Sequence, residues 1–170
     1  TPEWKSGGKT FWYENQGNQN QDFTRHDVYT DIRIGPERKI HTGDLDKDGD
    51  IDFLTSNAFG TYWHENLIVE TGASTLFTRH KLSNKYNLYD WIGDVDRDVE
   101  AGAVTGSPDI LTADLDTTFP TWWQNDGAGN FTMHTLPRGA NNPEAVISLD
   151  LDYDGDIDIV QAFFDYWLIG

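Results

Sequence analysis

The chain has 170 residues, no cysteine and a formal net charge of −17. This negative charge argues against nucleic acid and against anionic membrane surfaces as partners, because both would repel it. Without cysteine, neither disulfides nor thiolate metal sites can form, and no apolar run reaches the roughly 18 residues of a membrane span, so membrane insertion is not expected. Aromatic residues make up 14% of the chain. We therefore expect a packed core despite the modest aliphatic content.

The sequence repeats itself about three times. A Phe-Thr-x-His segment stands at residues 23–26, 77–80 and 131–134, at equal intervals. Each copy follows an aromatic segment, at 11–15, 62–66 and 122–127, and Tyr166 and Trp167 begin a further one. Such self-similarity is typical of repeat architectures.

Short strands are expected throughout the repeat. Residues 51–54 and 157–160 alternate in strand fashion and carry β-branched side chains. The aromatic segment leads into Gly- and Asn-rich turns, and the Phe-Thr-x-His segment is the returning strand. This pattern predicts an all-β fold of propeller-type blades, each of four antiparallel strands, in about three repeats of ~50 residues. We divide the single domain 1–170 into a partial blade 1–39, blades 40–90 and 91–146, and a partial blade 147–170.

Clustered aspartates precede the strands at 51–54 and 157–160. Closely spaced carboxylates repel one another unless a cation joins them, and Ca²⁺ accepts 6–8 oxygen ligands in a tolerant geometry. Gly49 and Gly155 follow the third acid of each loop, where an EF-hand loop turns sharply. No His lies in the loops, which disfavours zinc. The candidate calcium ligands of these two loops are Asp44, Asp46, Asp48, Asp50 and Asp52, and Asp150, Asp152, Asp154, Asp156 and Asp158.

The roles within a loop follow from position. Asp50 and Asp156 are expected to bind through their carbonyl oxygens, and Asp52 and Asp158 to close the shell with their carboxylates. The alternative is that these loops are Asp-rich turns held by side-chain hydrogen bonds, without an ion.

The second acidic loop in chain order offers Asp94, Asp96 and Asp98, and then Asp109 after an insertion at residues 99–107. It has no glycine at the turn. Either the insertion bulges out and returns Asp109 to the ion, or this site is lost. The sequence thus predicts two calcium sites and leaves the third open.

The acidic loop, the following strand, the Trp-Tyr-Glu-Asn-type segment and the Phe-Thr-x-His segment together resemble the FG-GAP/VCBS repeat. This repeat is the blade unit of integrin-α-like calcium-binding β-propellers. The resemblance covers residues 11–167 and implies four-stranded blades with calcium held in the acidic loops. It further implies a secreted, extracellular or cell-surface location and a role in adhesion or assembly. Closed propellers need about 4–8 blades; this chain supplies about three, so we expect self-assembly or further blades of the same protein.

No nucleophile elbow, phosphate loop or cysteine nucleophile is present, so we expect no enzymatic activity. His26, His80 and His134 recur at one repeat position and are expected to be structural. Trp91 and Trp123 fall outside the repeated aromatic position and are candidate glycan ligands. A carbohydrate-binding propeller is therefore the alternative function, and a carbohydrate-active lyase or hydrolase a more distant one. A protein ligand also stays open.

Overall fold

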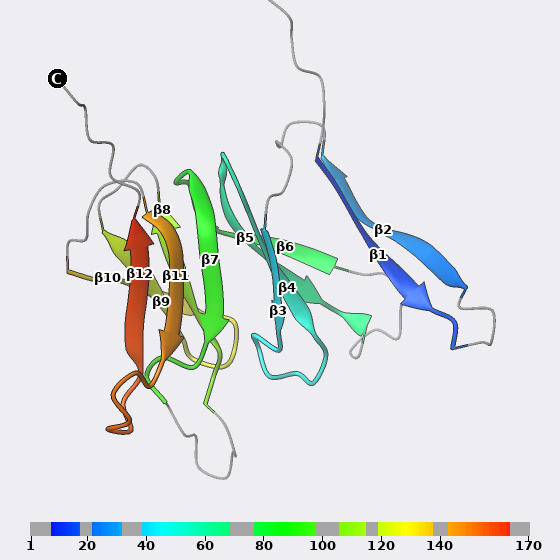
Figure 1. Cartoon of the computed structure of the whole chain (residues 1–170). Helices are drawn as coiled ribbons and strands as arrows, with labels where there is room; N and C mark the ends of the chain where they lie inside the picture. The colour runs from blue at the N-terminus through cyan, green and yellow to red at the C-terminus, as the bar shows by residue number, and fades with distance from the viewer. Residues whose placement is uncertain are drawn as a thin grey trace, which may run out of the picture.

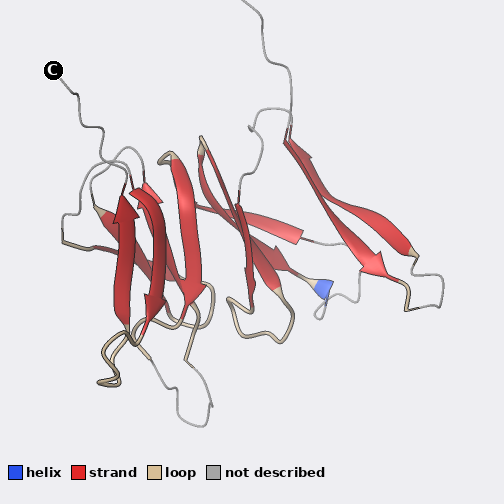
Figure 2. Ribbon diagram, in the orientation of Figure 1, coloured by secondary structure: helices blue, strands red, loops and turns tan. Residues whose placement is uncertain are grey.

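The computed structural model describes residues 8–17, 22–31, 39–68, 77–97, 106–114, 119–137 and 143–163. Apart from one helical turn that follows β5, its described elements are all strands (Figure 2). The strands are β1 (Gly8–Asn15), β2 (Phe23–Asp31), β3 (Lys39–Gly43), β4 (Asp52–Asn57), β5 (Gly60–Asn66), β6 (Phe77–Ser83), β7 (Asn87–Gly93), β8 (Asp109–Asp114), β9 (Pro120–Asn125), β10 (Phe131–Thr135), β11 (Pro143–Leu149) and β12 (Asp158–Phe163).

These strands form four antiparallel sheets that follow the chain order. Two sheets have four strands each, β3-β4-β5-β6 and β7-β8-β9-β10, and two are the pairs β1-β2 and β11-β12. Figure 1 shows the sheets side by side in a row, with the two pairs at its opposite ends. The predicted all-β fold with four-stranded antiparallel blades is confirmed, and the row corresponds to part of a propeller.

Glycines allow consecutive sheets to approach each other through their first strands. β7 contacts β3 of the preceding sheet and β11 of the following one. A Cβ added at Gly43, the last residue of β3, would lie 3.3 Å from Cγ2 of Ile92 in β7. At Gly93, which ends β7, it would lie 2.7 Å from the Ser148 Oγ of β11. The end of each strand therefore has little room for a side chain.

One of two buried core clusters among the described residues lies between the two four-stranded sheets. Leu45, Leu54, Trp63 and Ile110 form one buried cluster across this interface. The Trp63 ring covers Gly129 in the turn between β9 and β10, where an added Cβ would lie 2.3 Å from the ring. Because Gly129 also has a φ of +71°, the site requires glycine both for its backbone and for its contact.

The histidines of the Phe-Thr-x-His segments take part in this packing. Each ring stacks on the tryptophan of the neighbouring strand, and its Nε2 bonds to the side chain two residues after that tryptophan. For His80 the ring centroids of His80 and Trp63 are 4.4 Å apart, and Glu65 accepts at 2.7 Å. The same arrangement joins His26 to Trp12 and Glu14, and His134 to Trp122 and Gln124. These contacts agree with the structural role expected for the histidines.

Candidate metal centres

The three acidic loops each bring carboxylates together. In every loop, three aspartates offer oxygen atoms that lie within 4.8 Å of one another, close enough to hold a metal ion. The loops connect β3 to β4, β7 to β8 and β11 to β12. The groups are Asp44, Asp46 and Asp48; Asp94, Asp96 and Asp109; and Asp150, Asp152 and Asp158.

One backbone conformation recurs in all three loops. Lys47, Arg97 and Tyr153, each one residue after the second acid, have φ values of 59°, 51° and 62°. Non-glycine residues seldom adopt this left-handed region. Its recurrence at one position shows that the loops share a common turn, although only the first and third have the glycine, with φ of 99° at Gly49 and 101° at Gly155. The sequence reading overlooked these three residues, and only their equal spacing from the acids marks them.

Hydrogen bonds to the aspartates shape the loops. In the first loop, the Asp50 amide donates to Asp48 Oδ1 at 3.0 Å, and the Asp48 amide lies 3.4 Å from Asp46 Oδ1. In the third loop, the Asp156 amide donates to Asp154 Oδ1 at 2.9 Å. These are the bonds expected of Asp-rich turns, but each engages only one carboxylate oxygen. They therefore leave other oxygens available for an ion.

A metal site can be distinguished from a plain turn by buried carboxylate oxygens that have no hydrogen-bond donor. Oδ1 of the first acid in each loop, Asp44, Asp94 and Asp150, is buried and has no hydrogen-bond partner among the described residues. A buried carboxylate oxygen without a partner is costly. A cation would supply the missing partner. The first acid of all three loops has such a buried oxygen without a hydrogen-bond donor.

Asp52, the last acid of the first loop, also connects the loop to a neighbouring strand. Asp52 is fully buried, and its two oxygens accept main-chain N–H bonds from Leu45 at 2.9 Å and from Asn66 at 2.8 Å. The Asn66 side chain in turn donates to the Ile51 carbonyl at 3.1 Å. Asp52 thus ties the start of the acidic loop to the end of β5, and it lies outside the group formed by Asp44, Asp46 and Asp48.

We call this pair of amide bonds to the acid that ends the loop a bracket. Asp109 makes the same bracket in the next sheet. It accepts N–H bonds from Val95 at 2.9 Å and from Asn125 at 2.8 Å, while it also belongs to the second acidic group. The Asn125 side chain also donates to the Leu45 carbonyl of the preceding sheet at 2.6 Å. The sequence reading missed Asn66 and Asn125, although an Asn recurs three residues after each repeated tryptophan.

Burial disfavours the ionised form of these acids. It raises the pKa of Asp52 to about 7 and also raises the pKa of Asp109, against the opposing effect of their amide donors. Burial, followed by the neighbouring charge of Asp48, raises the pKa of Asp46. A cation at the loop would favour the ionised carboxylates.

The insertion in the second loop does return Asp109 to Asp94 and Asp96. Gly106, near the end of the insertion, donates its amide to Asp94 Oδ2 at 3.1 Å, and Gln124 Nε2 donates to Asp96 at 2.6 Å. Asp98 lies outside the described residues. The second acidic group, of Asp94, Asp96 and Asp109, therefore forms without the glycine of the other loops.

The remaining predicted ligands lie around these groups. Asp50 is buried and Asp156 is exposed, and neither side chain belongs to a group of three. Asp154 is exposed and receives the Asp156 amide. Arg97 of the second loop donates to the carbonyl of Gly155 in the third. Adjacent loops are thus connected.

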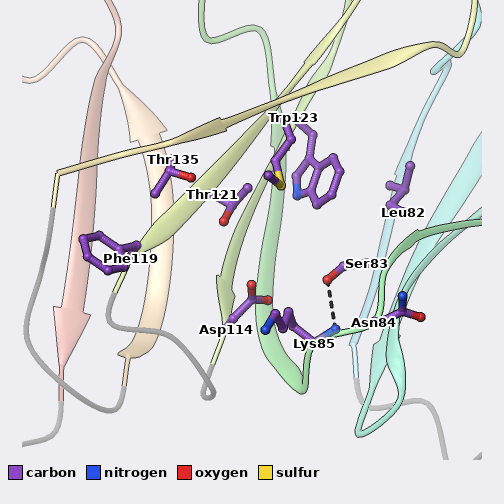
Figure 3. A pocket seen from close by; sticks show the side chains of 10 residues that line it. Leu82, Ser83, Asn84, Lys85, Asp114, Phe119, Thr121, Trp123 and Thr135 are labelled. Atoms are coloured by element: carbon purple, nitrogen blue, oxygen red, sulfur yellow. Dashed lines mark hydrogen bonds between the residues drawn. The ribbon is translucent and has the colours of Figure 1, made fainter.

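The two candidate glycan-binding tryptophans serve packing to different degrees. Trp91 is half-buried and packs against the cluster of Leu111, Ala113 and Val146. Trp123 donates its Nε1 to Thr112 Oγ1 at 3.2 Å, and it lines a groove of about 370 Å³ between β6 and β8–β10. Figure 3 shows its ring at this groove with the polar side chains of Asp114 and Lys85. Of the two, only Trp123 lines this groove.

Comparison with known proteins agrees with the repeat pattern. Residues 105–160 match the family model of the FG-GAP-like repeat. This confirms the expected resemblance for the stretch from the end of the second acidic loop through the third. A search of curated proteins gives no match to the chain. Within the described ranges, no helix has the length and apolar character needed to cross a membrane.

Proposed function

We propose that the protein is a non-catalytic, calcium-binding repeat module of the extracellular space, in which calcium stabilises the blades of an adhesion or assembly domain. The observation that carries this proposal is the buried, donor-free Oδ1 at Asp44, Asp94 and Asp150. The three loops share one backbone conformation, and each brings together carboxylates whose charge a cation would neutralise.

The donor set favours calcium over other metals. All three groups consist of carboxylates alone, and Ca²⁺ takes oxygen ligands in flexible geometry. Zinc would favour His or Cys, and Mg²⁺ keeps several waters and demands a strict octahedron. Asp44, Asp46 and Asp48 would hold the ion in the first loop, with the carbonyl of Asp50 as a further donor.

Bound calcium would fix the connection between the first two strands of each sheet. The ion neutralises charges that otherwise repel, so folding and binding are linked. Extracellular calcium modules bind with Kd of about 10⁻⁴–10⁻³ M. At ten times Kd, each site adds about 1.4 kcal/mol to the free energy of unfolding, a large share of the stability of a domain. The acidic composition and the FG-GAP-like repeat support the extracellular setting.

Thermal unfolding with calcium, with magnesium and with a chelator tests the proposal. Calcium should raise Tm by several degrees, magnesium should do so much less, and Asp44→Asn should remove part of the calcium effect. Asp27→Asn is the matched control, because Asp27 is an exposed acid outside the loops. A Tm that is the same in calcium and chelator would show that the loops are ion-free turns.

The groove beside Trp123 supports carbohydrate binding as a second candidate function. Trp123, the exposed ring of Phe119 and the polar side chains of Lys85 and Asp114 line one surface (Figure 3). Aromatic faces beside hydrogen-bonding groups suit sugar rings. Glycan-array binding that Lys85→Ala and Phe119→Ala abolish would support this function. Binding that both variants leave unchanged, or no binding to any glycan, would argue against it.

A further inference from the structure

One position of the repeat differs in charge between the two four-stranded sheets. It lies two residues after the repeated tryptophan, in the third strand of each sheet, and is Glu65 in β5 and Gln124 in β9. Glu65 bonds to Nε2 of His80 at 2.7 Å. Gln124 bonds to Nε2 of His134 at 2.9 Å. The two sheets therefore hold these side chains in the same way, and only one of them is an acid.

In the second sheet, this side chain reaches the acidic loop. Oε1 of Gln124 bonds to His134, and its Nε2 donates to Oδ2 of Asp96 at 2.6 Å. Asp96 is the second acid of its loop and belongs to the group of three carboxylates. One oxygen of this acid thus already has a hydrogen-bond donor, which reduces what the acid gains from a cation.

In the first sheet, a carboxylate stands where the second sheet has the amide. Oε2 of Glu65 accepts from His80, so its Oε1 corresponds to the donating Nε2 of Gln124. An ionised carboxylate only accepts hydrogen bonds. Asp46, the second acid of the first loop, therefore has a negative charge beside it where Asp96 has a donor.

The charge of Glu65 acts on Asp46. Burial, the charge of Asp48 and then the charge of Glu65 raise the pKa of Asp46. The effect of Glu65 is larger than that of Asp44, although Asp44 and Asp46 belong to the same group of three carboxylates. Glu65 is thus an electrostatic part of the first acidic group, even though it lies in a strand outside the loop.

A divalent cation stabilises the first group more than the second. It would attract the ionised side chain of Glu65 together with those of the loop, and it would offset their mutual repulsion. At the second loop, the neutral Gln124 adds no such attraction. Because calcium affinity rises with the number of charges around a site, the residue at this one position changes the affinity of the loop beside it.

We propose that this repeat position tunes calcium affinity, with Glu65 strengthening the first site and Gln124 weakening the second. The inference rests on the proposed function, since it takes calcium as the ion that the loops hold. It assigns to the first site a residue that lies outside the acidic motif. Glu65 acts here through its charge on the ion and on Asp46, and the loop acids remain the ligands.

Calcium titration followed by NMR separates the two sites in the intact 170-residue chain. Gly49 lies in the first loop, and Gly106 donates its amide to Asp94 of the second, so each amide signal reports one site. Glu65→Gln should raise the calcium midpoint of Gly49 by about tenfold and leave that of Gly106 unchanged. Gln124→Glu should lower the midpoint of Gly106 by about tenfold and leave that of Gly49 unchanged.

Both variants should fold, because each copies a pair that the chain already contains. Glu65→Gln copies the pair of Gln124 with His134. Gln124→Glu copies the pair of Glu65 with His80. In chelator, Glu65→Gln should raise Tm by about 2–4 °C, since it removes the repulsion with Asp46, and Gln124→Glu should lower it. A purely structural role would not couple a gain of stability in chelator to a loss of calcium affinity.

Glu14→Gln is the matched control. Glu14 occupies the same repeat position and bonds to His26 at 3.0 Å. Its sheet, β1-β2, contributes no residue to a group of three acids among the described residues. The change should therefore leave both calcium midpoints within about twofold of their values in the unchanged chain.

The outcomes distinguish this inference from the calcium proposal. Calcium midpoints that respond to neither Glu65→Gln nor Gln124→Glu would overturn the inference and leave the calcium sites in place. Midpoints that shift equally in the Glu14→Gln control would also overturn it, because the effect would then not depend on the neighbouring loop. If neither amide signal of the unchanged chain responds to calcium, the calcium proposal fails, and this inference fails with it.

Discussion

The first and third acidic loops have nearly the same sequence but lie in different surroundings. The first is Asp-Leu-Asp-Lys-Asp-Gly-Asp-Ile-Asp, and the third differs only at its fourth residue. In the first, Leu45 and Asp52 are fully buried, because the next sheet covers the loop. In the third, Leu151 is 58% exposed and Asp158 is half-buried. A motif of one sequence thus contributes differently to stability according to the sheet that lies next to it.

The largest difference is expected at the acids that end the two loops. Asp52→Ala should lower the free energy of unfolding by about 3–5 kcal/mol, because it leaves two buried amides without an acceptor. In chelator, where its place in the third acidic group does not contribute, Asp158→Ala should cost about 1 kcal/mol, since among the described residues only the Leu151 amide donates to it. Urea unfolding of both variants measures the difference. Equal losses would show that the neighbouring sheet does not determine the strength of the bracket.

The leucines of the two loops should differ next. Leu45→Ala removes a side chain from the cluster of Leu54, Trp63 and Ile110, so it should cost about 2–4 kcal/mol at any protein concentration. Leu151→Ala should cost below about 0.5 kcal/mol in a dilute, monomeric sample. Urea unfolding of both variants measures the two costs. Equal costs would show that burial of Leu45 by the neighbouring sheet does not stabilise the first loop.

The sheet of the first loop should also respond to acid in a way that the end strands do not. Burial, with the nearby charges of Arg79 and His80, lowers the pKa of His64 from 6.5 to about 3, while Tyr13 holds the equivalent place in β1. Between pH 6.5 and about 3, His64 therefore binds a proton in the unfolded state but not in the folded state. Stability contributed by neutral His64 is complete above pH 6.5 and is lost as the pH falls toward 3, by about 1.4 kcal/mol per pH unit.

Comparing the chain with His64→Gln between pH 7 and 5 isolates this contribution. The variant should be less stable at pH 7, because the contacts of His64 with Thr55 and Phe53 are altered. Its unfolding free energy should fall less steeply as the pH is lowered. Parallel pH profiles for the two proteins would show that His64 does not titrate on unfolding.

The smallest expected difference concerns calcium itself. Asp44→Asn and Asp150→Asn each remove one charge at the position whose Oδ1 lacks a donor. Each should reduce the calcium-dependent part of the unfolding free energy by about 1.4 kcal/mol at ten times Kd. Calorimetric titration should show one site fewer in either variant. If only one variant loses calcium binding, only that loop is a calcium site, and the other loop is a turn without an ion.

Much of the fold could be predicted from local pattern because the repeat is regular. The aromatic and Phe-Thr-x-His segments became neighbouring strands, as the stacking of Trp63 on His80 shows. The acids of the first loop could be placed together from their alternation alone, since every second side chain points to one side of the turn. The outcome at the second loop could not be predicted, because the sequence does not show whether an insertion returns to its starting point. The bracket of Asp52 with Asn66 was missed because it joins residues of two different segments.

The sequence by itself determined the strands, the turns and the acids of each loop, because these depend on residues close together in the chain. Only the tertiary structure decided which of two nearly identical loops is buried, because burial depends on the sheet that packs against it. It also decided the position of Trp123, at the groove rather than fully inside the core.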